Sequence, residues 1–273
     1  MEKLLLEKYL QPMSFYIFGI EVRYYGVMIA IGILSGFLLG CWLAKKKGYS
    51  EDVPYVLVLT VVPSAILGAR LYFLISEGRP IIEWWSRFEG LGIYGGIMGG
   101  VLAVYIYARA KKVSFFAVAD LLVPCLIMGQ ILGRWGNFFN GEAHGVMVDF
   151  DFFPISTYIN NGIEPAGFYL ATFFYESFLN ALGFILLLRI YFRQKKAGTT
   201  LATYLIWYGC VRALIEPFRT DSMKLIGESE FLLNKINFLI SIAIAGIGVL
   251  ILWLNNKGKI SQDDKGLFEG VRP

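Results

Sequence analysis

The feature that most constrains this chain is a series of long apolar runs. About 20 apolar residues can cross the hydrocarbon core of a bilayer as a helix, and a helix satisfies its own backbone polar groups there. Hydrophobic residues make up 56% of the chain and charged residues only 17%, which is not typical of a soluble domain. We therefore predict an all-α polytopic membrane protein with about seven transmembrane helices. The expected spans are residues 25–44, 54–75, 91–108, 115–132, 168–190, 200–217 and 238–254.

The basic residues predict an orientation. Of the 25 Lys and Arg residues, fourteen fall in loops 45–47, 109–112 and 189–196 and in the tail after residue 254, whereas eight fall on the alternate side. Because cytoplasmic loops carry an excess of Lys and Arg, the tail is expected in the cytoplasm and the N-terminus outside.

The chain is expected to form one integral membrane domain over residues 1–273. Within it, residues 1–21 are predicted to be an interfacial segment, since their leucines cluster on one side of a short helix. Residues 141–165 form the longest polar, turn-rich insert and are predicted to be a small extracytoplasmic arm or head.

A polar stretch, residues 133–145, directly follows the fourth apolar run. It brings Arg134, Asn137, Asn140, Glu142 and the single histidine, His144, to the membrane edge. Ionisable groups at membrane depth are costly and point to function. Four glycines are expected to let this backbone bend. The stretch is the first candidate for an active site.

A second polar group lies on the sixth span, where Arg212 and Glu216 are four residues apart on one helix face. Two arginines from different helices at head-group depth suit a phosphate, which a guanidinium can bind through two hydrogen bonds. Structural ion pairs, Arg212 with Glu216 and Arg134 with Glu142, are the alternative, and a pair can serve both purposes.

Other polar residues give weaker signals. Arg70 lies nearer mid-span and is either a ligand or one partner of a structural pair with Glu176 or Asp120. His144 is expected to make an ordinary loop hydrogen bond. The three cysteines lie in apolar runs and predict neither a disulfide nor a metal site. We expect no cofactor and no nucleic-acid partner.

The residues also carry a resemblance to a known family. The stretch Gly-Arg-Trp-Gly-Asn-Phe-Phe-Asn-Gly-Glu at 133–142 resembles the signature of bacterial prolipoprotein diacylglyceryl transferases. Further segments resemble the same family along nearly the whole chain: residues 23–26, 68–71, 94–99, 175–177 and 212–219.

The resemblance implies transfer of the diacylglyceryl group of phosphatidylglycerol to the lipobox cysteine thiol of a prolipoprotein, with release of glycerol phosphate. It implies a bacterial cytoplasmic (inner) membrane enzyme with its active site toward the outer leaflet. The expected catalytic residues are Arg134, Arg212, Tyr94, Glu142 and Glu216. The expected substrate-binding residues are Arg134, Arg212, Tyr25, Asn137, Asn140, Gly145 and Arg70.

One departure affects the mechanism. Some family members have a histidine where this chain has Tyr94, and a neutral phenol is a poor base at pH 7. We therefore expect the two arginines to dominate, Tyr94 to orient by a hydrogen bond, and the base to be undetermined by the sequence. The alternative function is a transporter or flippase for an anionic lipid or solute, which would be expected to show internal repeats.

Overall fold

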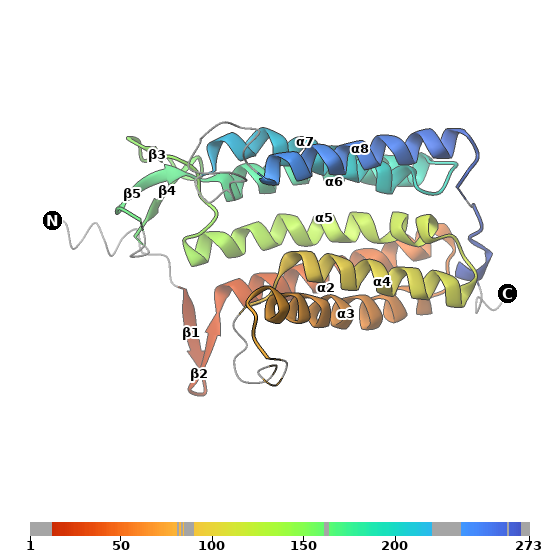
Figure 1. The fold of residues 1–273 in the computed structure, drawn as a ribbon, viewed down its shortest axis with the longest axis horizontal. Coiled ribbons are helices and arrows are strands. Elements are labelled where there is room, and N and C mark those ends of the chain that lie inside the picture. Colours follow the sequence, from red (N-terminus) through yellow and green to blue (C-terminus); the bar gives the residue numbers. More distant parts are fainter. Residues whose placement is uncertain are drawn as a thin grey trace.

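The protein is a helical bundle, shown in Figure 1. The computed structural model describes residues 13–80, 82, 84, 90–160, 164–219, 236–260 and 262–268. The long helices are α2 (Tyr24–Lys47), α3 (Asp52–Ser76), α4 (Ile93–Lys111), α5 (Phe115–Asn140), α6 (Thr172–Arg193), α7 (Thr199–Ile215) and α8 (Ile236–Asn256).

These helices confirm the all-α membrane architecture. Within the described residues, six helices are long and apolar enough to cross a membrane: α2, α3, α4, α5, α6 and α8. The seventh, α7, has 17 residues and continues directly into a 3-10 turn, η2 (Glu216–Phe218). At 1.5 Å per residue α7 reaches only about 25 Å, so the turn extends the helical segment toward the length of its neighbours.

Helix α5 lies at the centre, with α2 on one side and α6 and α7 on the other. The helices come closest to one another where small residues lie between them, as is typical of helices that pack within lipid. A Cβ at Gly36 of α2 would lie 3.0 Å from the carbonyl oxygen of Cys125 on α5. The glycines of α4 pack on α3 in the same way, with Gly95 against Gly68 and Gly99 against Ser64.

Helix α5 is longer than the sequence suggested. The apolar run ends at Leu132, but the helix continues to Asn140, so the backbone bends at Gly141 and not at Gly133 or Gly136. Gly136 instead makes room for a neighbour, since a Cβ on it would lie 2.8 Å from the ring of Tyr25 on α2. The bend comes later than the end of the apolar run, because continued helix satisfies the backbone while the polar side chains find partners near the helix end.

Two small sheets lie at one end of the bundle, called here the head end. Strands β1 (Ser14–Ile17) and β2 (Ile20–Arg23) form an antiparallel hairpin that leads into α2. The connection from α5 to α6 forms a three-stranded antiparallel sheet in the order β3-β5-β4, with β3 at Met147–Val148, β4 at Ser156–Ile159 and β5 at Gly167–Leu170.

These strands revise two expected boundaries. The fifth span was expected from residue 168, but residues 168–170 belong to β5 and α6 begins at Thr172. Of the expected interfacial segment, residues 1–12 lie outside the described residues, and residues 14–17 and 20–21 are in the hairpin rather than a helix.

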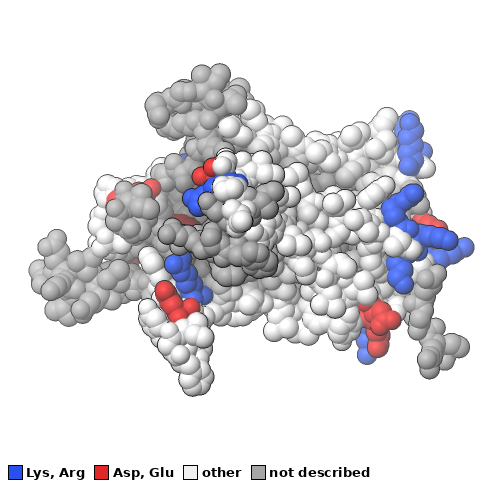
Figure 2. Space-filling model, turned by 60° about the horizontal axis from the view of Figure 1, so that its bottom comes forward, with Lys and Arg blue, Asp and Glu red and all other residues white. Residues whose placement is uncertain are grey.

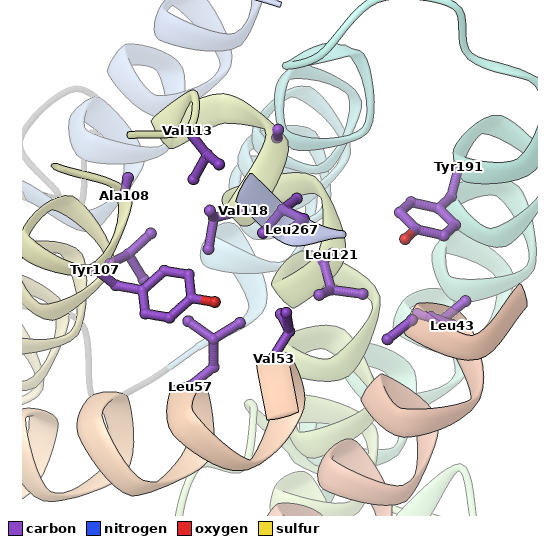
Figure 3. Packing of buried hydrophobic residues seen from close by; sticks show 13 residues of the cluster. Leu43, Val53, Leu57, Tyr107, Ala108, Val113, Val118, Leu121, Tyr191 and Leu267 are labelled. Atoms are coloured by element: carbon purple, nitrogen blue, oxygen red, sulfur yellow. The ribbon is translucent and has the colours of Figure 1, made fainter. Parts of the chain in front are cut away.

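The opposite end, called here the basic end, joins four segments of the chain. Ser50 donates its backbone N–H to Leu267, Ser114 to Asp263, and Ala197 to the side chain of Gln262, so the tail is bound to three helix connections. Beneath them lies a hydrophobic core that includes Leu43, Leu57, Leu121, Tyr191 and Leu267 (Figure 3). Figure 2 shows Lys and Arg gathered at this end, beside a largely uncharged surface along the helices.

Candidate active site

The C-terminal turn of α5 arranges the motif residues. Gly141 adopts a left-handed conformation (φ 63°) that ends the helix, and the next residue turns back, so that the N–H of Glu142 bonds the carbonyl of Asn137 (3.1 Å). The Glu142 carboxylate then accepts hydrogen bonds from the amides of Asn137 (3.0 Å) and Asn140 (3.2 Å). Asn137 in turn accepts from Arg134 at 3.5 Å.

A buried carboxylate, Glu176 of α6, organises the arginines. Its Oε2 lies 2.5 Å from Nη2 of Arg134, and its Oε1 lies 2.6 Å from Nη1 of Arg212. Nη1 of Arg219 is 3.1 Å from the same Oε1. The Glu176 side chain is only 2% exposed, so its charge depends on these partners.

The pairing differs from the two ion pairs considered from the sequence. Arg212 does pair with Glu216, at 3.3 Å, and that carboxylate is fully buried. Arg134, however, is paired with Glu176, while Glu142 is held by the two asparagine amides. The spacing in the sequence predicted the Arg212–Glu216 pair because its residues are four apart on one helical segment, α7 and η2. It did not predict the Arg134–Glu176 pair because that pair joins two helices, α5 and α6.

Arg219 reaches the cluster because the chain beyond η2 is fixed to the head. Gly145 forms a β-bridge with Arg219, and Val146 donates its N–H to the carbonyl of Phe218 at 3.1 Å. A Cβ on Gly145 would lie 2.7 Å from that same carbonyl oxygen. The contacts of Gly145 are therefore those of a residue that permits close backbone approach.

Tyr25 lies beside the motif on the first span. Its ring packs over Gly136, and its phenol is within electrostatic reach of Glu142 and Arg134. The side chain is 37% exposed, so it borders the cluster without being enclosed by it. The structure thus brings Tyr25, Arg134, Asn137, Asn140 and Glu142 together.

Tyr94 and Arg70 contact α3 and the connection between α3 and α4. The ring of Tyr94, at the start of α4, packs on Tyr72 of α3 with centroids 5.9 Å apart. Arg70 donates to the backbone carbonyls of Gly90 and Trp84, both at 3.3 Å. Tyr94 thus packs against α3, and Arg70 holds the connection before α4.

His144 makes the loop contacts expected of it. Its Nε2 lies 2.9 Å from Glu164, and its ring packs on Tyr169 with centroids 4.6 Å apart. The imidazole is buried in the head, 5% exposed. These contacts stabilise the sheet that fixes Gly145 and hence Arg219.

The ion-paired core of the cluster has one more cation than anion. Among the ion-paired groups, three guanidinium groups meet two buried carboxylates, Glu176 and Glu216. Glu142, held beside Arg134 by Asn137, is the exposed carboxylate that balances the third positive charge. Arg134 is the most exposed of the three arginines, at 23%, against 13% for Arg212 and 9% for Arg219. Each guanidinium has five N–H donors, so Arg134 in particular can bind an added anion while it stays paired.

Comparison with known proteins identifies the family. The family described as prolipoprotein diacylglyceryl transferase matches residues 12–254. The chain belongs to this family. Curated relatives named phosphatidylglycerol–prolipoprotein diacylglyceryl transferase include one from Clostridium kluyveri, 37% identical over 92% of this chain and 99% of the relative. Another, from Clostridium botulinum, is 42% identical over 79% and 88%, and one from Clostridium perfringens is 38% identical over 95% and 99%.

Within this member of the prolipoprotein diacylglyceryl transferase family, sequence reasoning underrated two residues of the cluster. Glu176 was noted in a motif and as one possible partner of Arg70, and Arg219 was counted with the outer loops. A carboxylate in the middle of an apolar run was the available signal for Glu176. For Arg219 the signal was its position seven residues after Arg212 on one face, although the helix ends at Ile215 and the bridge to Gly145 places Arg219.

Proposed function

We propose that this protein transfers the diacylglyceryl group of phosphatidylglycerol to the lipobox cysteine thiol of prolipoproteins, the first step of lipoprotein maturation. Family membership over nearly the whole chain supports the reaction. The observation that supports the site is the cluster of three arginines around Glu176, next to the motif of residues 133–142.

The cluster suits the phosphodiester of an anionic lipid. Its ion-paired core has one more cation than anion, and guanidinium N–H donors fit phosphate oxygens. We assign Arg134 to direct contact, because it is the most exposed of the three. Arg212 is placed behind it, oriented by Glu176 and Glu216.

In the reaction, the cysteine sulfur attacks the glycerol carbon that carries the phosphate. A carbon–sulfur bond forms, the carbon–oxygen bond breaks, and its electron pair leaves with glycerol phosphate. The arginines stabilise the charge that develops on the leaving oxygen, and their positive field favours the thiolate over the thiol. The proton leaves the thiol before or during attack, and Glu142 is the exposed carboxylate next to the cluster that can accept it.

We further propose that the site faces the outer leaflet of the bacterial cytoplasmic membrane. The cluster lies toward the head end, and the Lys- and Arg-rich connections lie at the other end of the helices (Figures 1 and 2). The excess of basic residues in cytoplasmic loops supports this direction. Phosphatidylglycerol would enter from the surrounding lipid.

The test is a transfer assay with purified protein in vesicles. Phosphatidylglycerol labelled in its acyl chains is supplied with a lipobox peptide, and label on the peptide is measured by mass spectrometry. A peptide with serine in place of the cysteine, and phosphatidylcholine in place of phosphatidylglycerol, are the matched controls. No label on the cysteine, with labelled lipid crossing between leaflets instead, would favour the flippase.

A substitution tests the role of Arg212. Lysine keeps the charge but has a single nitrogen, so it cannot contact Glu176 and Glu216 through two separate N–H groups as a guanidinium does. Arg212→Lys is therefore expected to lower the transfer rate about ten- to a hundredfold, which corresponds to the loss of one or two charge-assisted hydrogen bonds. Arg109→Lys, at the exposed end of α4, is the control for the same chemical change. Full activity of Arg212→Lys would contradict the proposed role.

A further inference from the structure

A cavity at the basic end lies away from the arginine cluster. Its volume is about 120 Å³, roughly that of four water molecules in the liquid, and it is partly open. The lining comes from the end of α2, from α5, from the end of α6 and from the tail: Lys47, Tyr49, Ala117, Asp120, Tyr191, Gln194, Lys195, Lys196, Ala197, Gln262 and Asp264. The space suits a single small polar group.

Cations outnumber anions on this lining. Three lysines, Lys47, Lys195 and Lys196, line the cavity together with two acidic residues. One of the carboxylates, Asp120, is 1% exposed and already accepts the N–H groups of Gly198 (2.6 Å) and Leu201 (2.7 Å) and the amide of Gln194 (2.9 Å). Its charge is therefore largely satisfied by the start of α7, and Asp264 is the remaining acidic group on the lining.

Two tyrosines add hydroxyl groups to the same lining. Tyr191 is 1% exposed, and its hydroxyl oxygen has no hydrogen-bond partner among the described residues, which is costly for a buried polar group. Lys47 lies over its ring, with Nζ 5.0 Å from the centroid. Burial first, and then Asp264 and Asp120, raise the pKa of Tyr49 to about 12, so this phenol stays protonated at neutral pH and can donate.

We propose that this cavity binds a phosphate group, held by Lys47 and Lys195 and by the hydroxyl of Tyr191. The group comes either from the head of an anionic lipid in the leaflet at the basic end or from free phosphate, since both offer the same oxygens. Basic pockets between transmembrane helices bind anionic head groups by this chemistry. An occupant would link α2, α6 and the tail, which all contribute to the lining.

The experiment measures lysine reactivity at the site itself, so that binding at the arginine cluster does not contribute. The full chain is placed in phosphatidylcholine nanodiscs, and acylation of each lysine is quantified by mass spectrometry. One arm adds phosphatidic acid to the bilayer and the other adds inorganic phosphate to the buffer. Lys46, exposed on the same helical turn as Lys47 but outside the lining, is the internal control.

Protection of Lys47 but not Lys46 is expected, about fivefold for an interaction near 1 kcal/mol per lysine. Protection by phosphatidic acid alone identifies a lipid head group, and protection by inorganic phosphate identifies the free ion. Equal protection of both lysines would mean general surface attraction and would overturn the proposal, as would no protection in either arm.

Two variants sharpen the result. Tyr191→Phe removes a hydroxyl that the fold leaves unpaired, so the protein should fold and retain transfer activity while the protection of Lys47 falls. Asp264→Asn removes the opposing carboxylate and should strengthen protection. Weaker protection in Asp264→Asn would show that the cavity prefers a cation, and full protection in Tyr191→Phe would remove that hydroxyl from the site; either result would contradict the proposal.

Discussion

The most informative perturbation is Glu176→Gln, because one buried carboxylate holds three arginines. The substitution keeps the size and shape of the side chain and removes its charge. It leaves Arg134, Arg212 and Arg219 without their common anionic partner. In the unmodified protein these arginines lie 2.5, 2.6 and 3.1 Å from the Glu176 carboxylate. The net charge of the cluster then becomes more positive by one.

The expected cost follows from burial. Glu176 is 2% exposed, and Arg212 and Arg219 are 13% and 9% exposed, so solvent screens the loss poorly. Removing one partner of a buried ion pair costs about 3–5 kcal/mol, because the remaining charge is left uncompensated. Arg212 keeps Glu216, which places the expected loss of unfolding free energy toward the lower part of that range.

The assay is thermal unfolding of the purified protein in neutral detergent, with and without phosphatidylglycerol. An anion that binds the folded state stabilises it by mass action, so added phosphatidylglycerol should stabilise Glu176→Gln more than the unmodified protein. Glu164→Gln, which breaks the partly exposed pair with His144, is the matched control and should cost less than about 1 kcal/mol. The reasoning is refuted if Glu176→Gln has the same unfolding temperature as the Glu164→Gln control. It is also refuted if phosphatidylglycerol stabilises Glu176→Gln no more than it stabilises the unmodified protein.

Two further substitutions test residues near the cluster. Gly145→Ala is expected to lower the transfer rate at least about tenfold, because a Cβ 2.7 Å from the Phe218 carbonyl oxygen pushes the Arg219 segment away. Circular dichroism should show little loss of helix content. Wild-type activity would show that the bridge does not position Arg219. Tyr94→Phe is expected to lower the transfer rate less than about tenfold, which corresponds to the free energy of one hydrogen bond, since the ring packs on Tyr72. A loss as large as that of Arg134→Ala would instead give the phenol a central role.

Much of the fold could be predicted because lipid restricts what a chain can do. Apolar runs of sufficient length must form helices in a bilayer, so the positions of the spans follow from composition along the chain. The boundaries were less well predicted where a span meets polar residues. Helix α5 continues eight residues beyond its apolar run, and α6 begins four residues after the expected start, because hydrogen bonds rather than hydropathy end these elements.

The candidate site divides in the same way. The sequence by itself determined that Arg134, Asn137, Asn140 and Glu142 lie together, since they share one short stretch after the fourth apolar run, and that Arg212 can reach Glu216. Only the tertiary structure decided that Glu176 joins α5 to α7 and that Gly145 holds Arg219 in place. Helical periodicity fixes contacts within four residues, whereas contacts between α5, α6 and α7 depend on how the helices pack, and that depends on the whole chain.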